Sequence, residues 1–338
     1  MKRVVYTDPS WALDGNGQVD PALADIESEV YGDDIQIDLG LRESGKFVVA
    51  GRAFEARLAG ADAVVVYRCE VTPELLAIVQ PTCKVVARQG VGLDNLNAPL
   101  LAQSGLYGFH VPDYCGDEVS THAVALLLAL ERGVCVQNDL VKTNRWSIHG
   151  GGVPRRTCER TAGIVGLGRI GRATARKLES IYETILAYDP NVSADLMASL
   201  GVVKVDELTE LIASSEAILL HAELTEETEG LLARQALMHA RNGALLVNTA
   251  RGKLVDPGAV IEALECGRLG GFASDVFAPE NPNETAETRA LLERDDVIVS
   301  AHRAFLSAES ERSLRRRVAE GVAHVLCTSE PPPLGRVA

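Results

Sequence analysis

The sequence predicts an α/β fold with parallel sheets, divided between two domains. Short apolar runs alternate with helical segments along most of the chain, which is typical of parallel sheets. At 338 residues, the chain is longer than one hydrophobic core usually serves. Apolar residues make up 46% and charged residues 24% of it, the composition of an ordinary globular protein.

The expected strands form two series on either side of a long helix at residues 117–132. The first series is expected at residues 4–7, 34–38, 63–67, 84–87 and 107–111. The second is expected at residues 161–165, 184–188, 202–205, 217–220, 244–247, 271–274 and 297–300. Helices between and after the strands are expected at residues 21–29, 72–79, 96–104 and 308–327. Residues 329–333, SEPPP, have the composition of a flexible end.

Charge and cysteine content argue against several classes of function. The formal net charge is −14, so nucleic-acid binding is not expected. The seven cysteines are scattered and never spaced as CxxC, which indicates a reducing compartment and no zinc site or disulfide framework. The longest apolar stretch, residues 123–130, is too short to cross a bilayer. We expect a cytoplasmic protein with no metal, nucleic-acid or membrane partner.

A glycine-rich motif lies between an expected strand and a helix at residues 166–171. GxGxxG alone is often only a tight turn, but in this context it is the dinucleotide-binding fingerprint. The first glycine permits the turn, the second lets the backbone approach a pyrophosphate, and the third lets helix and strand pack closely. The helix N-terminus then faces the phosphates. We expect cofactor contacts from Gly166, Leu167, Gly168, Arg169, Ile170 and Gly171.

Asp189 ends the next expected strand, about 20 residues downstream, as the fingerprint requires. A carboxylate there accepts hydrogen bonds from ribose hydroxyls and repels a 2′-phosphate, and no arginine directly follows it. The alternative is an aspartate that caps a helix before Pro190. We favour the cofactor interpretation, with NAD rather than NADP.

Three polar residues follow successive strands of the second series. Arg251 follows ALLVNTA, Glu280 comes shortly after GGFASDV, and His302 follows VIVSA. In an open parallel sheet these carboxyl ends face the ligand crevice. A histidine can donate a proton near neutral pH, an arginine can hold a carboxylate, and a carboxylate can orient the histidine ring. The set suits reduction of a 2-oxo acid by NADH, with His302 as the proton donor.

Each of these residues also has a structural interpretation. Arg251 and Glu280 would be solvated surface residues, and His302 a histidine with satisfied hydrogen bonds at a strand end. Their joint placement after a dinucleotide fingerprint favours the catalytic interpretation. His221 either lines the cofactor crevice or only ends its strand. The remaining histidines lack a partner in the motifs and are assigned structural roles: His110, His122, His149, His239 and His324.

Five stretches together resemble the D-isomer-specific 2-hydroxyacid dehydrogenase family: RQGVGLDNLN, GIVGLGRIG, LLVNTARGKLVD, ASDVFAPE and VIVSAHRAF. The motifs are closest to the C-terminal-binding-protein-like branch. The resemblance implies two Rossmann-like domains, one flavodoxin-like and one dinucleotide-binding. The NAD-binding domain would span residues 109–304, inserted into a substrate domain made of residues 1–108 and 305–338.

The resemblance also implies functional residues. It makes Arg251, Glu280 and His302 the catalytic set and places Asp275 against the nicotinamide amide. Further cofactor contacts are expected from His221, Ala222, Thr228, Thr249, Ala250 and Ala304.

The stretch from Arg88 to Gly92 is similar to the family's substrate loop. Its glycines would expose backbone N–H groups to a substrate carboxylate, although a plain strand-to-helix turn is the alternative. The residues concerned are Arg88, Gly90, Val91 and Gly92. Phe305 lies in a loop that resembles the aromatic-bearing loop of the same branch, and Arg68 is a further substrate-binding candidate with a surface charge as its alternative.

Two hypotheses of function follow. The first is an NAD-dependent dehydrogenase that interconverts a small 2-oxo acid and its D-2-hydroxy acid. Arg68, Arg88 and Arg303 suggest a second anionic group on that acid, a carboxylate or phosphonate. The second is an NADH-sensing, corepressor-like binding protein with little turnover. The resemblance further implies a homodimer formed by the cofactor domains, with residues 117–146 in contact.

Overall fold

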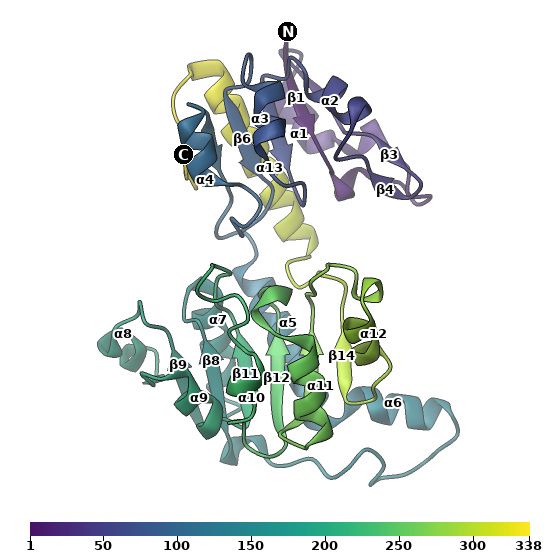
Figure 1. Ribbon diagram of the computed structural model, residues 1–338, viewed down its shortest axis with the longest axis vertical. Helices are drawn as coiled ribbons and strands as arrows, with labels where there is room; N and C mark the ends of the chain where they lie inside the picture. The colour runs from purple at the N-terminus through teal and green to yellow at the C-terminus, as the bar shows by residue number, and fades with distance from the viewer. The chain divides into compact units, whose positions relative to one another are not determined.

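The computed structural model describes residues 1–338, which divide into two compact units (Figure 1). The first unit joins Met1–Tyr114 to Ser307–Ala338, and the second is the continuous segment Cys115–Leu306. The chain passes from the first unit to the second after Tyr114, later than the boundary at residue 108 that the resemblance implied. The reason is that β7 (Tyr107–Phe109) pairs with β6 (Val85–Arg88) and so belongs to the sheet of the first unit.

The first unit is built on a five-stranded sheet in the order β2-β1-β5-β6-β7, and every pair in it is parallel. Counted within the sheet, this is the flavodoxin-like order 2-1-3-4-5. A two-stranded antiparallel hairpin, β3-β4, stands apart from it. The strands are β1 (Lys2–Tyr6), β2 (Ile35–Asp38), β3 (Arg42–Glu43), β4 (Lys46–Phe47), β5 (Ala63–Val66), β6 (Val85–Arg88) and β7 (Tyr107–Phe109).

Helices cover both faces of the first sheet. One apolar core contains residues of α1 and α13, and another, on the opposite face, contains residues of α2, α3 and α4. The helices are α1 (Asp25–Tyr31), α2 (Arg52–Leu58), α3 (Pro73–Val79), α4 (Ala98–Gln103) and α13 (Ala308–Thr328). Because both faces are covered, β5 reads as an unbroken buried run, AVVV.

The second unit contains a seven-stranded parallel sheet in the order β10-β9-β8-β11-β12-β13-β14. Within the sheet this is 3-2-1-4-5-6-7, the Rossmann order with one strand added. The strands are β8 (Thr161–Val165), β9 (Thr184–Tyr188), β10 (Val203–Lys204), β11 (Ala217–Leu220), β12 (Ala244–Asn248), β13 (Leu269–Ser274) and β14 (Val297–Val299). The predicted α/β fold with two parallel sheets is therefore confirmed.

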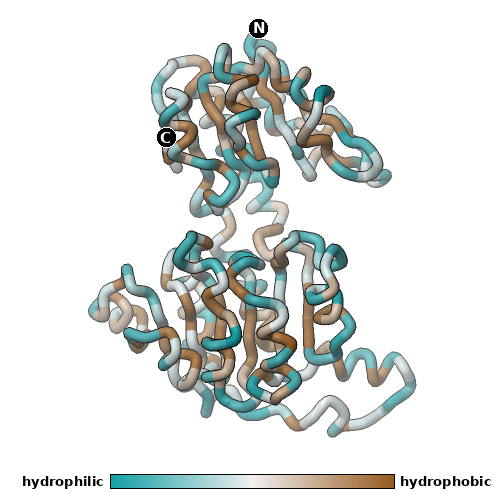
Figure 2. The backbone as a smooth tube through the Cα atoms, in the orientation of Figure 1, coloured by the Kyte–Doolittle hydropathy of each residue, from teal (hydrophilic) through white to brown (hydrophobic).

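The second sheet is also covered on both faces. Residues of α5, α7 and α8 form one core with it, and residues of α9, α10, α11 and α12 form the other. The strands carry the most hydrophobic stretches of the backbone, whereas the connecting segments are largely hydrophilic (Figure 2). The helices are α5 (Gly116–Arg132), α6 (Val134–Lys142), α7 (Arg169–Leu178), α8 (Ala194–Ser199), α9 (Leu208–Ser214), α10 (Arg234–Leu237), α11 (Pro257–Glu265) and α12 (Ala286–Leu292).

Local signals set where several helices begin. Ser307 starts α13 with a capping box, in which its side chain accepts from the Ser310 backbone while the Ser310 side chain accepts from the Ser307 backbone. Asp256 caps α11, and Pro257 follows at the first helical position. No single helix is long and apolar enough to cross a membrane. Taken together, α5 and α6, which are bent by 60° at Gly133, are long and apolar enough by length and composition alone.

Candidate active site and cofactor site

The glycine motif forms the turn between β8 and α7. Gly166 has φ +90°, and a Cβ atom there would lie 2.6 Å from the Ala222 backbone nitrogen. A Cβ atom at Gly171 would lie 2.2 Å from the Gly166 carbonyl oxygen. Both positions therefore require glycine for close packing. At Gly168, by contrast, a Cβ atom would meet no atom within 4 Å, so the backbone at the start of α7 stays open to an approaching group.

Asp189 is joined to this turn. It follows β9, and its carboxylate accepts hydrogen bonds from the backbone N–H groups of Leu167 (2.8 Å) and Asn191 (2.9 Å). These contacts fix the carboxylate beside the glycine turn. This is the arrangement that the fingerprint requires for an acidic group that binds ribose.

Further predicted cofactor residues follow β11 and β12 at the same carboxyl edge. The Thr228 hydroxyl donates to the Glu223 carbonyl (2.6 Å) and accepts from the Thr225 N–H, which ties together the loop after Ala222. The Thr249 hydroxyl is buried and has no hydrogen-bond partner. A buried polar atom without a partner, at the same carboxyl edge of the sheet as the open glycine turn, fits a site that a polar ligand completes.

His221 ends β11, but its ring turns toward α7. Its Nε2 lies 2.9 Å from the Thr174 hydroxyl. Burial lowers the pKa of the imidazole from 6.5 to about 4, so the ring is neutral at physiological pH. These contacts agree with the interpretation of His221 as a strand-end residue with satisfied hydrogen bonds.

Arg251 lies in a loop braced by Asn248, the last residue of β12. The Asn248 side chain donates to the Arg251 carbonyl (2.8 Å) and accepts from the Ala250 N–H (3.0 Å). The next residue, Gly252, packs against the backbone after β13, where a Cβ atom would lie 2.1 Å from the Phe277 carbonyl carbon. The glycine therefore lets the loop of Arg251 touch the loop that leads to Glu280.

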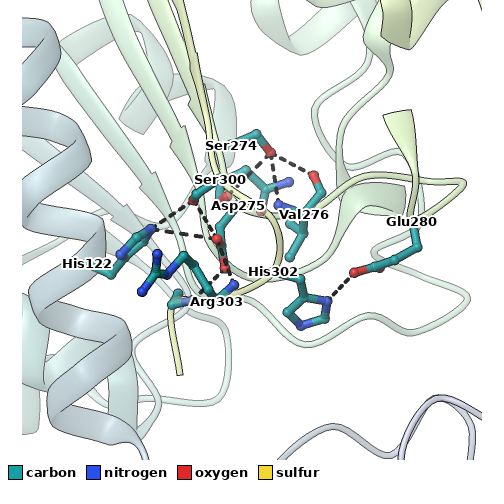
Figure 3. Close-up of polar contacts among 10 residues, drawn as sticks. His122, Ser274, Asp275, Val276, Glu280, Ser300, His302 and Arg303 are labelled. Carbon is teal, nitrogen blue, oxygen red and sulfur yellow. Dashed lines mark hydrogen bonds and ion pairs between the residues drawn. The ribbon is translucent and has the colours of Figure 1, made fainter. Parts of the chain in front are cut away.

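Glu280 and His302 form a hydrogen-bonded pair (Figure 3). His302 Nδ1 lies 2.5 Å from Glu280 Oε1, and the two side chains are 43% (Glu280) and 25% (His302) exposed. Since a carboxylate only accepts, Nδ1 carries the proton and donates it to Glu280. The ring is thereby oriented with Nε2 available for another partner. Phe305 stands edge-on to the same imidazole, with ring centroids 6.4 Å apart.

Asp275 contacts the segment that carries His302 and is 1% exposed. Its carboxylate accepts from the backbone N–H groups of Arg303 (3.0 Å) and Ala304 (2.8 Å) and from the Ser300 hydroxyl (2.5 Å). Its backbone carbonyl accepts from the His302 N–H at 2.8 Å. The carboxylate predicted to bind the nicotinamide amide thus holds the segment that carries His302.

His122 also contacts this group, a contact that the sequence did not indicate. Its Nε2 lies 2.9 Å from the Ser300 hydroxyl and 3.6 Å from Asp275 Oδ1. His122 and Ser300 are 178 positions apart in the sequence. No spacing rule links a mid-helix histidine to a strand end, so only the folded packing of α5 reveals the pair.

The substrate residues predicted in the first unit lie at the carboxyl ends of β5 and β6. Asp8 accepts hydrogen bonds from the backbone N–H groups of Tyr67, Arg68 and Cys69, at 3.0, 2.6 and 3.1 Å. The Asn95 side chain donates to the carbonyls of Tyr67 and Cys69. The loop that carries Arg68 is therefore held from both sides.

Arg88 joins the same network. It is 9% exposed, and its Nε donates to Asn95 Oδ1 at 3.2 Å. Gly90 has φ +154°, a conformation that favours glycine, and a Cβ atom there would displace the Arg88 guanidinium from its present position. Arg68 and Arg88 are thus positioned through one shared asparagine.

The loop from Gly90 to Gly92 is held by the strand end after β7. The Val111 N–H donates to the Gly90 carbonyl (3.2 Å), and His110 Nδ1 lies 2.7 Å from the Val91 carbonyl. His110 therefore has a partner within the substrate motif, contrary to what the sequence suggested. The residues of this loop belong to the first unit, and the catalytic set belongs to the second.

Comparison with known families identifies the second unit. Residues 124–304 match the sequence model of the D-isomer specific 2-hydroxyacid dehydrogenase, NAD binding domain. These residues include the glycine motif and the three residues predicted to be catalytic, Arg251, Glu280 and His302.

Individual relatives agree with that match. A D-3-phosphoglycerate dehydrogenase from Archaeoglobus fulgidus is 34% identical over 245 residues, which cover 72% of this chain and 45% of the relative. The chain thus spans about half the length of the phosphoglycerate dehydrogenases it matches. A glyoxylate reductase from Thermofilum pendens is 32% identical over 259 residues, 75% of each chain. The crystal structure of D-lactate dehydrogenase from Aquifex aeolicus, complexed with NAD and lactic acid, superposes with a TM-score of 0.83 at 26% identity, covering 96% of this chain and 95% of that one.

Proposed function

Since the chain belongs to the D-isomer-specific 2-hydroxyacid dehydrogenase family, we propose that it is an NAD-dependent oxidoreductase that interconverts a small 2-oxo acid and its D-2-hydroxy acid. The observation that carries the proposal is the pair of His302 and Glu280, joined at 2.5 Å on the second unit, the one that carries the glycine fingerprint. A histidine oriented by a carboxylate is what proton transfer to a carbonyl oxygen needs.

Each catalytic side chain has a distinct task in this proposal. When bound, NADH supplies the hydride that reduces the oxo carbon. His302 Nε2 donates a proton to the carbonyl oxygen, while Glu280 holds Nδ1–H and stabilises the imidazolium that carries the proton beforehand. In the reverse direction, neutral His302 removes the hydroxyl proton. Arg251 binds the substrate carboxylate, for which a guanidinium offers a planar, two-pronged donor.

The cofactor would be held by the glycine turn and by the loops along the carboxyl edge. Asp189 would accept from the ribose hydroxyls, and the open backbone at Gly168 would lie against the pyrophosphate. The unpaired Thr249 hydroxyl would gain a partner. The remaining residues predicted to contact the cofactor are Leu167, Arg169, Ile170, His221, Ala222, Thr228, Ala250, Asp275 and Ala304. Of these, His221 turns its ring toward Thr174, so only its backbone would face the cofactor.

The substrate would carry a second anionic group, a carboxylate or a phosphonate. Arg68 and Arg88 support this because Asp8 holds the backbone N–H of Arg68, and Asn95 holds the side chain of Arg88, at neighbouring strand ends. Backbone N–H groups of the loop from Gly90 to Gly92 would bind the acid that all such substrates share. Phe305 would pack against the remainder of the substrate beside His302.

A substrate panel followed by NADH absorbance tests the proposal. We expect turnover of dianionic 2-oxo acids to exceed that of pyruvate, and His302→Asn to lower kcat by about 1,000-fold while NADH fluorescence still reports binding. Glu280→Gln should lower kcat less. Binding of NADH without turnover of any 2-oxo acid would refute the dehydrogenase and favour the NADH-sensing alternative. Equal rates for pyruvate and the dianions would refute the second anionic group.

We also propose a cytoplasmic homodimer formed through the second unit. Apolar side chains gather on α6 and the segment after it, where Trp146, Ile148 and Val153 are 86%, 84% and 74% exposed. Large apolar side chains grouped on a surface mark protein interfaces. Light scattering should give a dimer, and Trp146→Asp combined with Ile148→Asp should give a monomer.

A further inference from the structure

His302 adopts a backbone conformation that requires support. Its φ is +49°, in the left-handed region that residues with a side chain rarely occupy. Such conformations persist only where surrounding contacts enforce them. Here the contacts come from Asp275, which binds the N–H groups of Arg303 and Ala304 through its carboxylate and that of His302 through its carbonyl.

The direction of the hydrogen bonds at Asp275 follows from their chemistry. A carboxylate only accepts, so the single Ser300 hydroxyl proton points to Asp275 Oδ1 at 2.5 Å. The Ser300 oxygen then accepts from His122 Nε2–H at 2.9 Å. The chain of donors therefore runs from His122 on α5, through Ser300, to Asp275 (Figure 3).

A buried carboxylate needs such donors. Asp275 is 1% exposed, so neighbouring groups must replace the water that would otherwise stabilise its charge. Two backbone N–H groups supply part of this, and the Ser300 hydroxyl supplies another hydrogen bond to Oδ1, oriented by His122. Two basic side chains lie near this carboxylate in Figure 3: Arg303, which is exposed, and His122, which is one quarter exposed.

We propose that His122 and Ser300 are positioning residues: through the Asp275 carboxylate they hold residues 300–304 in the conformation that directs His302 to Glu280. This inference rests on the proposed function, because it assigns them a task in placing the proton donor. Their main effect is expected on the rate of the chemical step, since the segment they hold carries the proton donor. A misplacement of a catalytic group by a fraction of an ångström is enough to slow that step.

Conservative pairs of substitutions test the proposal in the full-length protein. Ser300→Ala should lower kcat about tenfold and leave the KM values for NADH and the 2-oxo acid within about twofold. Ser300→Thr keeps the hydroxyl and should restore kcat. His122→Leu should behave like Ser300→Ala, whereas His122→Gln keeps an N–H donor and should recover part of the rate. Ser215→Ala is the matched control, since it removes a buried hydroxyl that is bonded to the Leu211 carbonyl at 2.7 Å, at the end of α9 and without any contact to Asp275 among the hydrogen bonds of this hydroxyl.

A second measurement does not depend on turnover. Without cofactor, the amides of Arg303 and Ala304 should exchange hydrogen about tenfold faster in Ser300→Ala than in the unmodified protein, and at the unmodified rate in Ser215→Ala. Unchanged exchange and unchanged kcat in both Ser300→Ala and His122→Leu, with His302→Asn inactive, would overturn the inference and leave the proposed function standing. A raised KM for NADH at unchanged kcat would also overturn it, because the effect would then lie in cofactor binding. If the unmodified protein reduces no 2-oxo acid, the proposed function fails, and the exchange rates still decide whether these residues hold the segment.

Discussion

Replacing His221 with glutamine should make the stability of the protein less sensitive to acid. Burial lowers the pKa of His221 from 6.5 to about 4, so the unfolded chain binds a proton at this residue between these values and the folded protein does not. Stability therefore falls as the pH drops through this window. The whole effect amounts to about 3 kcal/mol, and about 2 kcal/mol of it is lost between pH 7.5 and pH 5.

The assay is urea unfolding followed by circular dichroism at pH 7.5 and pH 5. For His221→Gln, the difference in unfolding free energy between the two pH values should be about 2 kcal/mol smaller than for the unmodified protein. The glutamine can still hydrogen-bond the Thr174 hydroxyl, but it does not titrate. His239→Gln is the control, because the His239 side chain is exposed. The reasoning is refuted if His221→Gln shows the same difference between the two pH values as the unmodified protein.

Three further predictions concern the cofactor site and the catalytic set. Gly168→Ala should fold with an unchanged Tm but bind NADH at least about tenfold more weakly, because a Cβ atom there fills only the open space beside the turn. Gly166→Ala should instead lower the Tm by several degrees, because its Cβ atom would clash with the backbone of Ala222. Scanning calorimetry and NADH titration separate the two, and a Gly168→Ala protein with full NADH affinity would contradict the site. Asp189→Asn, which keeps an acceptor but removes the charge, should shift the ratio of kcat/KM for NADPH over NADH upward by about 100-fold, and an unchanged ratio would show that the carboxylate does not face the 2′ position. Arg251→Lys should raise the KM for the 2-oxo acid about tenfold or more at constant NADH affinity, measured by initial rates, and an unaffected KM would remove Arg251 from the substrate site.

Much of the architecture follows from local sequence patterns, as the strands show. Buried runs such as AVVV at β5 and AILL at β11 have no competing interpretation between helical segments, and both are strands. The hairpin β3-β4 and the helix α2 were not predicted, because each hairpin strand has only two residues and the seven residues of α2, RAFEARL, mix polar and apolar side chains without a continuous apolar run. Residues 329–333, expected to be a flexible end, are followed by residues 335–338, which hydrogen-bond to Gly108 and His110. The composition of the segment alone does not predict this contact.

The site divides in the same way. The glycine turn, Asp189 and the pair of Glu280 and His302 could be proposed from the sequence because each follows an expected strand. The contacts that hold them were not found, since they join residues far apart in the chain. Asp8 reaches the Arg68 N–H across 60 positions, and Ser300 meets His122 across 178. Such contacts depend on how helices pack on a sheet, and a pattern of residue types does not record that.

The split of the first unit across the two ends of the chain has a consequence for synthesis on the ribosome. Arg315 in α13 pairs with Glu27 in α1, 288 positions earlier, and the cation stacks on Trp11, so the core between these helices closes only after translation has passed residue 315. The second unit is one uninterrupted stretch and contains every partner of its own sheet. During synthesis, the second unit should therefore fold before the first unit is complete. The amino-terminal strands should remain only partly folded until α13 has been synthesised and packs on them.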